Sequence, residues 1–288
     1  MGEEIKDFKE EIENQQNSAS LQPQNVEVGF ELITRAERAS GLVVRDDQYD
    51  FYWLEEAARK TRKKGYRFSL IDTGFLPSEK IEWLATAGAD IYSSDEAQRE
   101  ITQLEFIQVV CRRGRSILAY FFRGSLNSDE TSTVGQSLSN LGAQGVFLHL
   151  ANREEEEIKL MVPLALECRR GGSWLVYYHR GSLEEYLYPL AEAGVWLHLS
   201  SQQIRTEKEE TVLLELAKLC QKKGGNIILY LENELSLIFL DDLLRAGGFL
   251  VFLHQLYDYR SPFRPLQEEA RRRKLDWRAY YLYPKLLR

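Results

Sequence analysis

One stretch of this sequence, residues 171–202, contains a strand, a turn, an amphipathic helix and a second strand in a single short unit. Residues 174–178 are apolar without a polar break, which is typical of a strand covered on both faces. Ser182 then stands three residues before Glu185, a capping-box pattern that predicts the start of a helix. A second continuous apolar run occupies residues 195–199. The stretch is therefore predicted to be a β-α-β unit with two buried parallel strands.

The same order of features recurs along the chain. Basic residues followed by glycine precede every second expected strand, and glycine precedes the others. Helical segments fall between the strands, so a unit of roughly fifty residues with the order αβαβ occurs four times. Cys111, Cys168 and Cys220 occupy the same place in this repeat, and we expect them to be small buried residues, not a disulfide or metal set. The expected strands are 67–73, 89–94, 116–123, 146–152, 173–180, 195–201, 226–233 and 249–255.

Eight short βα units predict a closed (β/α)8 barrel of the TIM type with a fourfold αβαβ internal repeat. An open α/β solenoid of the leucine-rich type is the alternative, but the regular leucine spacing and asparagine ladder of such proteins are missing. We expect a flexible polar N-terminal tail (1–27), an N-terminal helix/strand extension that closes the bottom of the barrel (28–48), the barrel (49–262), and a C-terminal helix and aromatic tail (263–288).

Charge and composition limit the partners. The net charge of −7 argues against nucleic acid. No apolar stretch approaches membrane-spanning length, and the acidic N-terminus does not resemble a secretory signal. Three cysteines without evident pairing suit a reducing compartment. We therefore expect a cytoplasmic protein with a small-molecule substrate and no membrane or nucleic-acid partner. The aromatic C-terminal tail either packs on the barrel or docks on another subunit of a homo-oligomer or on a protein partner.

The candidate catalytic residues come from the alternation of side chains along each strand. In a barrel the aliphatic set contacts the helices and the other set points inward, and the carboxyl ends of the strands carry the chemistry. This assignment places all four histidines of the chain, with two acids, inward near strand ends. Such groups are costly to bury without partners, which is typical of functional sites. They are His149, His179, His198, His254, Asp72 and Glu232.

Two kinds of chemistry fit this set. Imidazole and carboxylate groups from several strands can hold a divalent metal, Zn²⁺, Mn²⁺ or Fe²⁺, with one position open for water or substrate. Alternatively, histidine and carboxylate pairs act directly as general acid and base. A structural interpretation is also open, in which each histidine only bonds a nearby group such as Tyr92 and stabilises the core. The candidate metal ligands are His149, His198, His254 and Glu232.

Two turns resemble anion sites, because each combines arginine, glycine and serine at the start of an expected helix. The first contains Arg123 and Ser125, and the second contains Arg180 and Ser182. A simpler interpretation, which we favour, is that Gly-Ser forms an efficient turn and helix cap.

The sequence has no dinucleotide-binding glycine motif, no P-loop and no H-E-x-x-H. It predicts an enzyme that acts on a small molecule, with an anion as one option, in the hydrolase, lyase or isomerase class. The alternative function is a non-catalytic barrel scaffold or a protein-interaction module.

Overall fold

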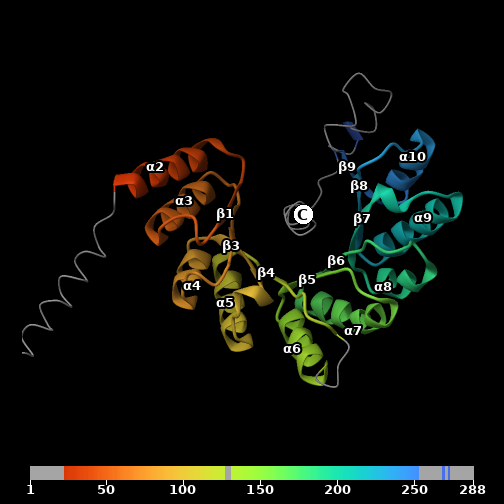
Figure 1. Ribbon diagram of the computed structural model, residues 1–288, viewed down its shortest axis with the longest axis horizontal. Helices are drawn as coiled ribbons and strands as arrows, with labels where there is room; N and C mark the ends of the chain where they lie inside the picture. The colour runs from red at the N-terminus through yellow and green to blue at the C-terminus, as the bar shows by residue number, and fades with distance from the viewer. Residues whose placement is uncertain (1–22, 127–130, 253–267, 270–271, 273–288) are drawn as a thin grey trace, which may run out of the picture. The chain divides into compact units, whose positions relative to one another are not determined.

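The computed structural model describes residues 23–126, 131–252, 268–269 and 272 of the chain. Within these residues strands and helices alternate, and nine strands lie in one sheet in the order β1 to β9 (Figure 1). The pairs β1–β2 and β2–β3 are parallel, as are all pairs from β4 to β9. The strands are β1 (Leu42–Arg45), β2 (Phe68–Ile71), β3 (Ala89–Ser94), β4 (Leu118–Phe121), β5 (Phe147–Ala151), β6 (Leu175–Tyr178), β7 (Trp196–Ser200), β8 (Asn226–Leu231) and β9 (Phe249–Phe252).

The helices confirm the α/β class. Each expected strand is present, and an α-helix follows each strand from β1 to β8. A short 3₁₀ turn precedes the helix after β3, β6 and β7. The helices are α2 (Pro23–Arg38), α3 (Phe51–Lys63), α4 (Ser78–Thr86), α5 (Ile101–Gly114), α6 (Thr131–Ala143), α7 (Glu155–Gly171), α8 (Tyr188–Glu192), α9 (Glu207–Lys222) and α10 (Leu237–Arg245). Short 3₁₀ turns are η1 (Asp95–Ala97), η2 (Glu185–Leu187) and η3 (Ser201–Gln203).

The predicted N-terminal extension contains a helix and a strand, α2 and β1, and β1 is a member of the sheet, beyond the eight strands that the sequence assigned to it. It pairs in parallel with β2 from Leu42 opposite Phe68 to Arg45 opposite Ile71. Leu42 is 5% exposed, which agrees with a place in the core. The pattern within this segment indicates a strand but not which strand pairs with it. The described sheet therefore has nine strands where the sequence predicted eight.

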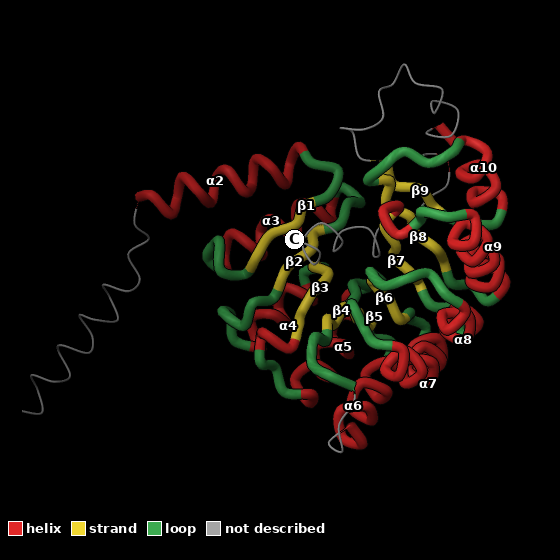
Figure 2. Tube along the Cα trace, turned by 45° about the vertical axis from the view of Figure 1, so that its right-hand side comes forward, coloured by secondary structure: helices red, strands yellow, loops and turns green. Residues whose placement is uncertain are grey.

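The contacts divide the described chain into two compact units. Unit 1 contains the described residues up to Tyr92 and Val110–Ser116, and unit 2 contains Ser93–Val109 and the described residues from Ile117 onward. In unit 2, helices α6 to α10 lie along one side of strands β5 to β9, as Figures 1 and 2 show. Fully buried residues of unit 1 include Leu32, Leu54, Phe68, Ile81 and Leu84, and those of unit 2 include Leu104, Leu190, Leu213, Ile227 and Leu240.

The helix-to-strand joints share one conformation. After each helix from α3 to α10 one residue has a positive φ, and it is glycine at seven joints but Arg115, with φ 54°, after α5. The sequence pattern had aligned Gly114 at this joint. Gly114 serves packing instead, since a Cβ there would lie 2.5 Å from the carbonyl oxygen of Ala85. An L-residue such as Arg115 is strained in the left-handed region.

The cysteines confirm the prediction of small buried residues. Cys111, Cys168 and Cys220 are free thiols, buried in α5, α7 and α9. Each carbonyl accepts the backbone N–H five residues later, at 2.9, 2.9 and 2.8 Å. Burial raises the pKa of each thiol to about 12, so none is a ready nucleophile.

The helix within residues 171–202 starts later than its capping pattern predicted. Glu185 begins the 3₁₀ turn η2, and α8 follows with Pro189 in its first turn. The carbonyl of Ser182 accepts hydrogen bonds from His179 and Tyr186, so local side-chain contacts form in place of the predicted cap.

Two further expectations concern the ends of the chain. Residues 1–22 of the predicted flexible tail (1–27) and all but three residues of the predicted C-terminal tail lie outside the described residues. Residues 23–27 are helical, in α2, which corrects that part of the predicted tail. Among the helices that the structure describes, none has the length and apolar character needed to cross a bilayer.

Candidate functional site

Strand register decides which side chains share a face in unit 2. Tyr178 of β6 lies directly opposite His198 of β7. His149 of β5 lies opposite Val176, two residues before Tyr178, and Tyr230 of β8 lies opposite Ser200, two residues after His198. Because residues two apart point to the same side, His149, Tyr178, His198 and Tyr230 share one face. We call this side of β4 to β9 the histidine face.

These four side chains form a ladder across four neighbouring strands. The hydroxyl of Tyr178 lies 3.1 Å from Nδ1 of His149, and the hydroxyl of Tyr230 lies 3.0 Å from Nδ1 of His198. The rings of Tyr178 and His198 approach to 4.6 Å between centroids. All four side chains are buried. This part of the site follows the structural interpretation of the histidines, in which each bonds a tyrosine.

Burial fixes the charge of the ladder. It lowers the pKa of His149 to about 3 and lowers the pKa of His198 well below its usual range, with a further contribution from His149. Both imidazoles are therefore neutral near pH 7. A general acid–base catalyst works best with a pKa near the working pH, so these two histidines suit hydrogen bonding better than proton transfer. Nε2 of His149 is buried and has no hydrogen-bond partner among the described residues.

His179 does not belong to this face, which corrects the predicted convergence of the histidines. Because Tyr178 faces His149 and His198, the neighbouring Tyr177 and His179 point to the opposite side. Aromatic residues fill both alternating sets of this strand, so the sequence alone could not tell the two faces apart.

Both ring nitrogens of His179 form hydrogen bonds. The carbonyl of Ser182 can only accept, so Nε2 of His179 donates to it, at 2.9 Å. Nδ1 is then an acceptor for the hydroxyl of Tyr177, at 3.1 Å. The Tyr177 oxygen in turn accepts the backbone N–H of Arg153, at 3.0 Å. Burial lowers the pKa of His179. This neutral histidine is held in a closed structural network.

Asp72 also has a local structural role. Its Oδ1 accepts the N–H of Gly74 at 3.0 Å, and its backbone N–H donates to the carbonyl of Tyr92 at 2.9 Å. Leu70 lies opposite Ile91 and Ile71 opposite Tyr92, so Asp72 and Tyr92 point to opposite faces of β2 and β3. The residues predicted to point inward from β2 and from β3 therefore lie on different faces of the sheet. Both alternating sets of a buried strand are largely apolar, so the sequence does not distinguish the two faces.

Glu232 lies where the sequence predicted. It follows β8, is half-buried, and accepts a hydrogen bond from the hydroxyl of Ser200. Ser200 is on the histidine face, which places the Glu232 carboxylate on that face at the carboxyl ends of the strands. Among the described residues no lysine or arginine forms an ion pair with Glu232.

The predicted metal ligands do not gather in the described part of the chain. No three His, Cys, Asp or Glu side chains there lie close enough to hold an ion. His149 and His198 are separated by strand β6, whose Tyr178 ring stands between them. His254 lies outside the described residues.

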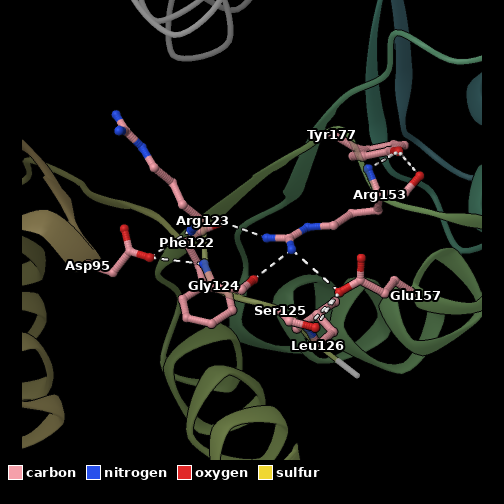
Figure 3. Close-up of polar contacts among 9 residues, drawn as sticks. All are labelled: Asp95, Phe122, Arg123, Gly124, Ser125, Leu126, Arg153, Glu157 and Tyr177. Atoms are coloured by element: carbon pink, nitrogen blue, oxygen red, sulfur yellow. Dashed lines mark hydrogen bonds and ion pairs between the residues drawn. The ribbon is translucent and has the colours of Figure 1, made fainter. Parts of the chain in front are cut away.

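The first predicted anion turn is occupied by the protein's own carboxylates (Figure 3). Asp95 Oδ2 accepts the N–H groups of Arg123 and Gly124 at 2.8 and 3.0 Å. Glu157 Oε1 accepts the N–H of Leu126 at 2.6 Å and the hydroxyl of Ser125 at 3.2 Å. The turn thus binds anions as its composition suggests, but these N–H groups are not free for an external ligand.

Arg153, which the sequence reasoning missed, holds the same 122–126 loop from the other side. Its guanidinium donates to the carbonyls of Gly124 at 2.6 Å and Phe122 at 2.9 Å, and lies 3.5 Å from Glu157 (Figure 3). The Arg153 side chain is only 5% exposed. Its spacing of four residues from Glu157 was the available signal, because such pairs meet on a helix. At the second turn Arg180 and Ser182 are exposed, and no described contact gathers them into an anion site.

The same device recurs at other strand ends. Asp46, after β1, is fully buried and accepts the N–H groups of Thr73 at 3.0 Å and Leu76 at 3.1 Å in the loop after β2. The Ser201 hydroxyl, after β7, accepts the N–H groups of Glu232 and Asn233 in the loop after β8. In each case a side chain beyond one strand binds the loop backbone beyond the neighbouring strand. Many polar groups at the strand ends are thereby used inside the fold.

Comparison with known proteins adds no family. No protein-family model matches the chain, and no curated protein matches it. Among solved structures, a dihydropteroate synthetase crystallised with a product is 11% identical over 77% of this chain and 84% of its own, with a TM-score of 0.31. The catalytic domain of a β-amylase from Paenibacillus polymyxa is 7% identical over 81% of this chain and 89% of its own, with a TM-score of 0.28. Likeness at this level says nothing about the activity of this chain.

Proposed function

We propose that this chain is an acid–base enzyme that binds a small molecule on the histidine face, with Glu232 as the proton-transferring group. The observation that carries the proposal is the hydrogen bond from Ser200, which holds the Glu232 carboxylate on that face beside the carboxyl end of β8. Ligands of parallel α/β proteins bind at the carboxyl ends of the strands. Carboxylates are, with histidine, the usual general bases. The reaction class is that of a hydrolase, lyase or isomerase.

His149 has a different role in this proposal. A neutral imidazole can form one directed hydrogen bond without bringing charge into the site. Leaving a buried nitrogen unpartnered costs about 1–3 kcal/mol, so a ligand that bonds Nε2 recovers that energy. His198 supports His149 through the Tyr178 ring between them. His179 and Asp72 have no part in the chemistry.

The closed barrel with a fourfold repeat belongs to the same proposal. Both faces of the central strands are buried, since Leu197 and His198 are each 1% exposed on opposite sides of β7. Parallel sheets are covered in this way in closed barrels. Leu42 and Asp46 donate their N–H groups to β2, so the N–H of Val43 between them points away from β2. In a closed barrel hydrogen exchange at Val43 is slow, whereas exchange within minutes at neutral pH contradicts closure.

Metal-assisted chemistry is a second form of the proposal, because one predicted ligand, His254, lies outside the described residues. Elemental analysis of purified protein tests it. Stoichiometric Zn, Mn or Fe that is lost in both His149→Ala and His198→Ala supports a metal. A metal-free protein rejects it. The three buried thiols support the cytoplasmic location inferred from sequence.

A non-catalytic scaffold or interaction module is the alternative, and the internally bound loops favour it. The carboxylates of Asp46, Asp95 and Glu157 are used to hold loop backbone. A scaffold needs such rigid strand ends but no ligand.

A binding screen separates the two functions. A panel of neutral, cationic and anionic small molecules is tested by saturation-transfer NMR on the wild type, Glu232→Gln and the matched control Glu234→Gln, whose side chain is exposed. The enzyme proposal expects a compound that binds the wild type and the control but at least about tenfold more weakly to Glu232→Gln. If no compound binds, or if compounds bind equally well to the wild type and to Glu232→Gln, the scaffold is the better description.

A further inference from the structure

We propose that His179 and Tyr177 form a pH-sensitive switch that acts on the backbone of Arg153. When His179 binds a proton, the Tyr177 hydroxyl turns from the imidazole to the carbonyl of Arg153. We call this arrangement the His179 switch. It lies within unit 2 and uses neither Glu232 nor the ladder, so it does not depend on the proposed function.

The Tyr177 hydroxyl has two acceptors within reach of its single hydrogen. Its oxygen lies 3.1 Å from Nδ1 of His179 and 3.4 Å from the carbonyl oxygen of Arg153. The same oxygen accepts the N–H of Arg153 at 3.0 Å, so both backbone groups of Arg153 lie beside the hydroxyl (Figure 3). A hydroxyl donates one hydrogen, so the charge state of His179 decides which acceptor receives it.

In the neutral state the hydroxyl hydrogen points to His179. The Ser182 carbonyl accepts Nε2–H of His179 at 2.9 Å, and it also accepts the Tyr186 hydroxyl at 2.9 Å. A neutral imidazole has one N–H, so Nδ1 carries the lone pair and accepts the hydrogen of Tyr177. Tyr177 then binds only the N–H of Arg153 and not its carbonyl.

Protonation reverses the bond between His179 and Tyr177. A proton from water binds Nδ1, and the new N–H donates to the Tyr177 oxygen. The hydrogen bond from the hydroxyl to Nδ1 breaks, and the hydroxyl hydrogen turns to the Arg153 carbonyl. Nε2 keeps its bond to Ser182, so every donor still has an acceptor. His179 therefore becomes charged inside a satisfied network, and Tyr177 holds both backbone groups of Arg153.

The titratable and charged groups around His179 come from three segments. They are Tyr177 of β6, Glu184 and Tyr186 of the turn after β6, and Arg153, Glu154, Glu155 and Glu157 of the joint between β5 and α7. Strand β7 adds Leu197 and Leu199 on this face, and η3 adds Gln203, which donates to the Gly181 carbonyl. The next residue along the chain, Arg180, is exposed.

These surroundings are acidic on balance. The Arg153 guanidinium is paired with Glu157, which leaves the other three glutamates. The hydroxyl of Tyr186 lies 3.4 Å from Nε2 of His179, and its pKa is raised by burial and then by these glutamates. An imidazolium here meets carboxylates at close range. Because burial lowers the pKa of His179, the proton binds below the ordinary value of 6.5.

The switch acts on a residue that holds a neighbouring loop. The Arg153 guanidinium donates to the carbonyls of Phe122 and Gly124, which fixes the 122–126 loop. A second hydrogen bond to the backbone of Arg153 therefore tightens the joint that carries this contact. Mild acid is expected to strengthen the joint at a pH where the fold is intact.

NMR of the full chain from pH 7.5 down to about 4.5 tests the switch. The ¹⁵N shifts of the His179 ring should show the Nε2–H tautomer at pH 7.5 and one protonation step below pH 6.5 in the folded protein. The ¹³C shift of the Arg153 carbonyl should move with the same midpoint, because this carbonyl gains a donor only when His179 is charged.

Three variants separate the switch from a general effect of acid. In Tyr177→Phe the Arg153 carbonyl should lose its step while the His179 ring still titrates. In His179→Gln the step should also be lost, because the amide does not titrate and Tyr177 is intact. The control His149→Gln should keep both steps. Circular dichroism at pH 7.5 checks that each variant folds.

Four results contradict the switch. His179 carries its proton on Nδ1 at pH 7.5, or it becomes charged only as the chain unfolds. The Arg153 carbonyl of the wild type shows no step with the midpoint of His179, or that step persists in Tyr177→Phe or His179→Gln.

Discussion

Two histidine networks in unit 2 are built from the same residue types and differ in one respect. His179 uses both ring nitrogens, on Tyr177 and on the carbonyl of Ser182. His149 uses only Nδ1, on Tyr178, while its Nε2 has no partner in the described chain. Both rings are buried and both have lowered pKa values. A satisfied network is explained by stability alone, whereas an open buried nitrogen points to a missing partner.

The difference also follows position. The His179 network joins the backbone of Arg153, whose side chain holds the 122–126 loop. It therefore belongs to the framework of strand ends. The His149 ladder lies on the sheet face that also carries Glu232. Burial and histidine content are therefore the same in the two networks. They differ in whether each ring nitrogen has a hydrogen-bond partner.

Low pH should lower the free energy of unfolding more than any substitution below, because it protonates the histidines of the ladder. The folded-state pKa of His149 lies at about 3, below the ordinary value of 6.5, so the unfolded chain binds the extra proton between these values. Stability is thus full above pH 6.5 and falls as the pH drops toward 3, by up to about 5 kcal/mol for this residue. Urea unfolding at pH 7.5, 6.0 and 5.0 measures it. His149→Gln should flatten the pH dependence, and an unchanged slope would show that the ladder is not a buried neutral pair.

Removal of the Arg153 side chain should cause the second largest loss of stability. In Arg153→Leu the carbonyls of Phe122 and Gly124 lose their donor, and Glu157 loses its ion-pair partner. Breaking a buried pair costs about 3 kcal/mol. Arg170→Leu is the matched control, because Arg170 pairs with Glu167 while 72% exposed and should change stability little. Equal unfolding midpoints for the two variants would mean that the 122–126 loop is not held by Arg153.

The two tyrosines test the comparison directly. Tyr177→Phe removes the acceptor for the Arg153 N–H and the donor to His179, with an expected loss of about 2 kcal/mol. Tyr178→Phe removes the bond to Nδ1 of His149, with an expected loss of about 1 kcal/mol. Chemical denaturation of both variants gives the order. A larger loss for Tyr178→Phe would reverse our reading of which network is structural.

The smallest expected change in stability concerns Arg115, which lies outside both networks. Arg115 has φ 54° at a joint where the other helices have glycine. Arg115→Gly should raise the free energy of unfolding by about 1 kcal/mol, because glycine adopts this region without strain. A loss of stability would show that the Arg115 side chain contributes more than its backbone costs.

Much of the fold could be predicted from local pattern. The continuous apolar runs, the glycines between them and the equivalent cysteines identified every strand from β2 to β9 and the α/β class. The sequence also placed His149, His198 and Glu232 on one face, because β5, β7 and β8 each have one clearly aliphatic alternating set. In these strands the alternation of residues within the strand itself shows which side chains face the helices.

Only the tertiary structure decided the rest. The face of His179 depended on the register of β6 against β5 and β7, since both alternating sets of β6 are apolar. The membership of β1 depended on its pairing with β2. The occupants of the anion turn, Asp95 and Glu157, come from 28 to 32 residues away along the chain. Register and long-range hydrogen bonds join segments that are distant in sequence, so a pattern read within one segment determines what each element is but not which groups it meets.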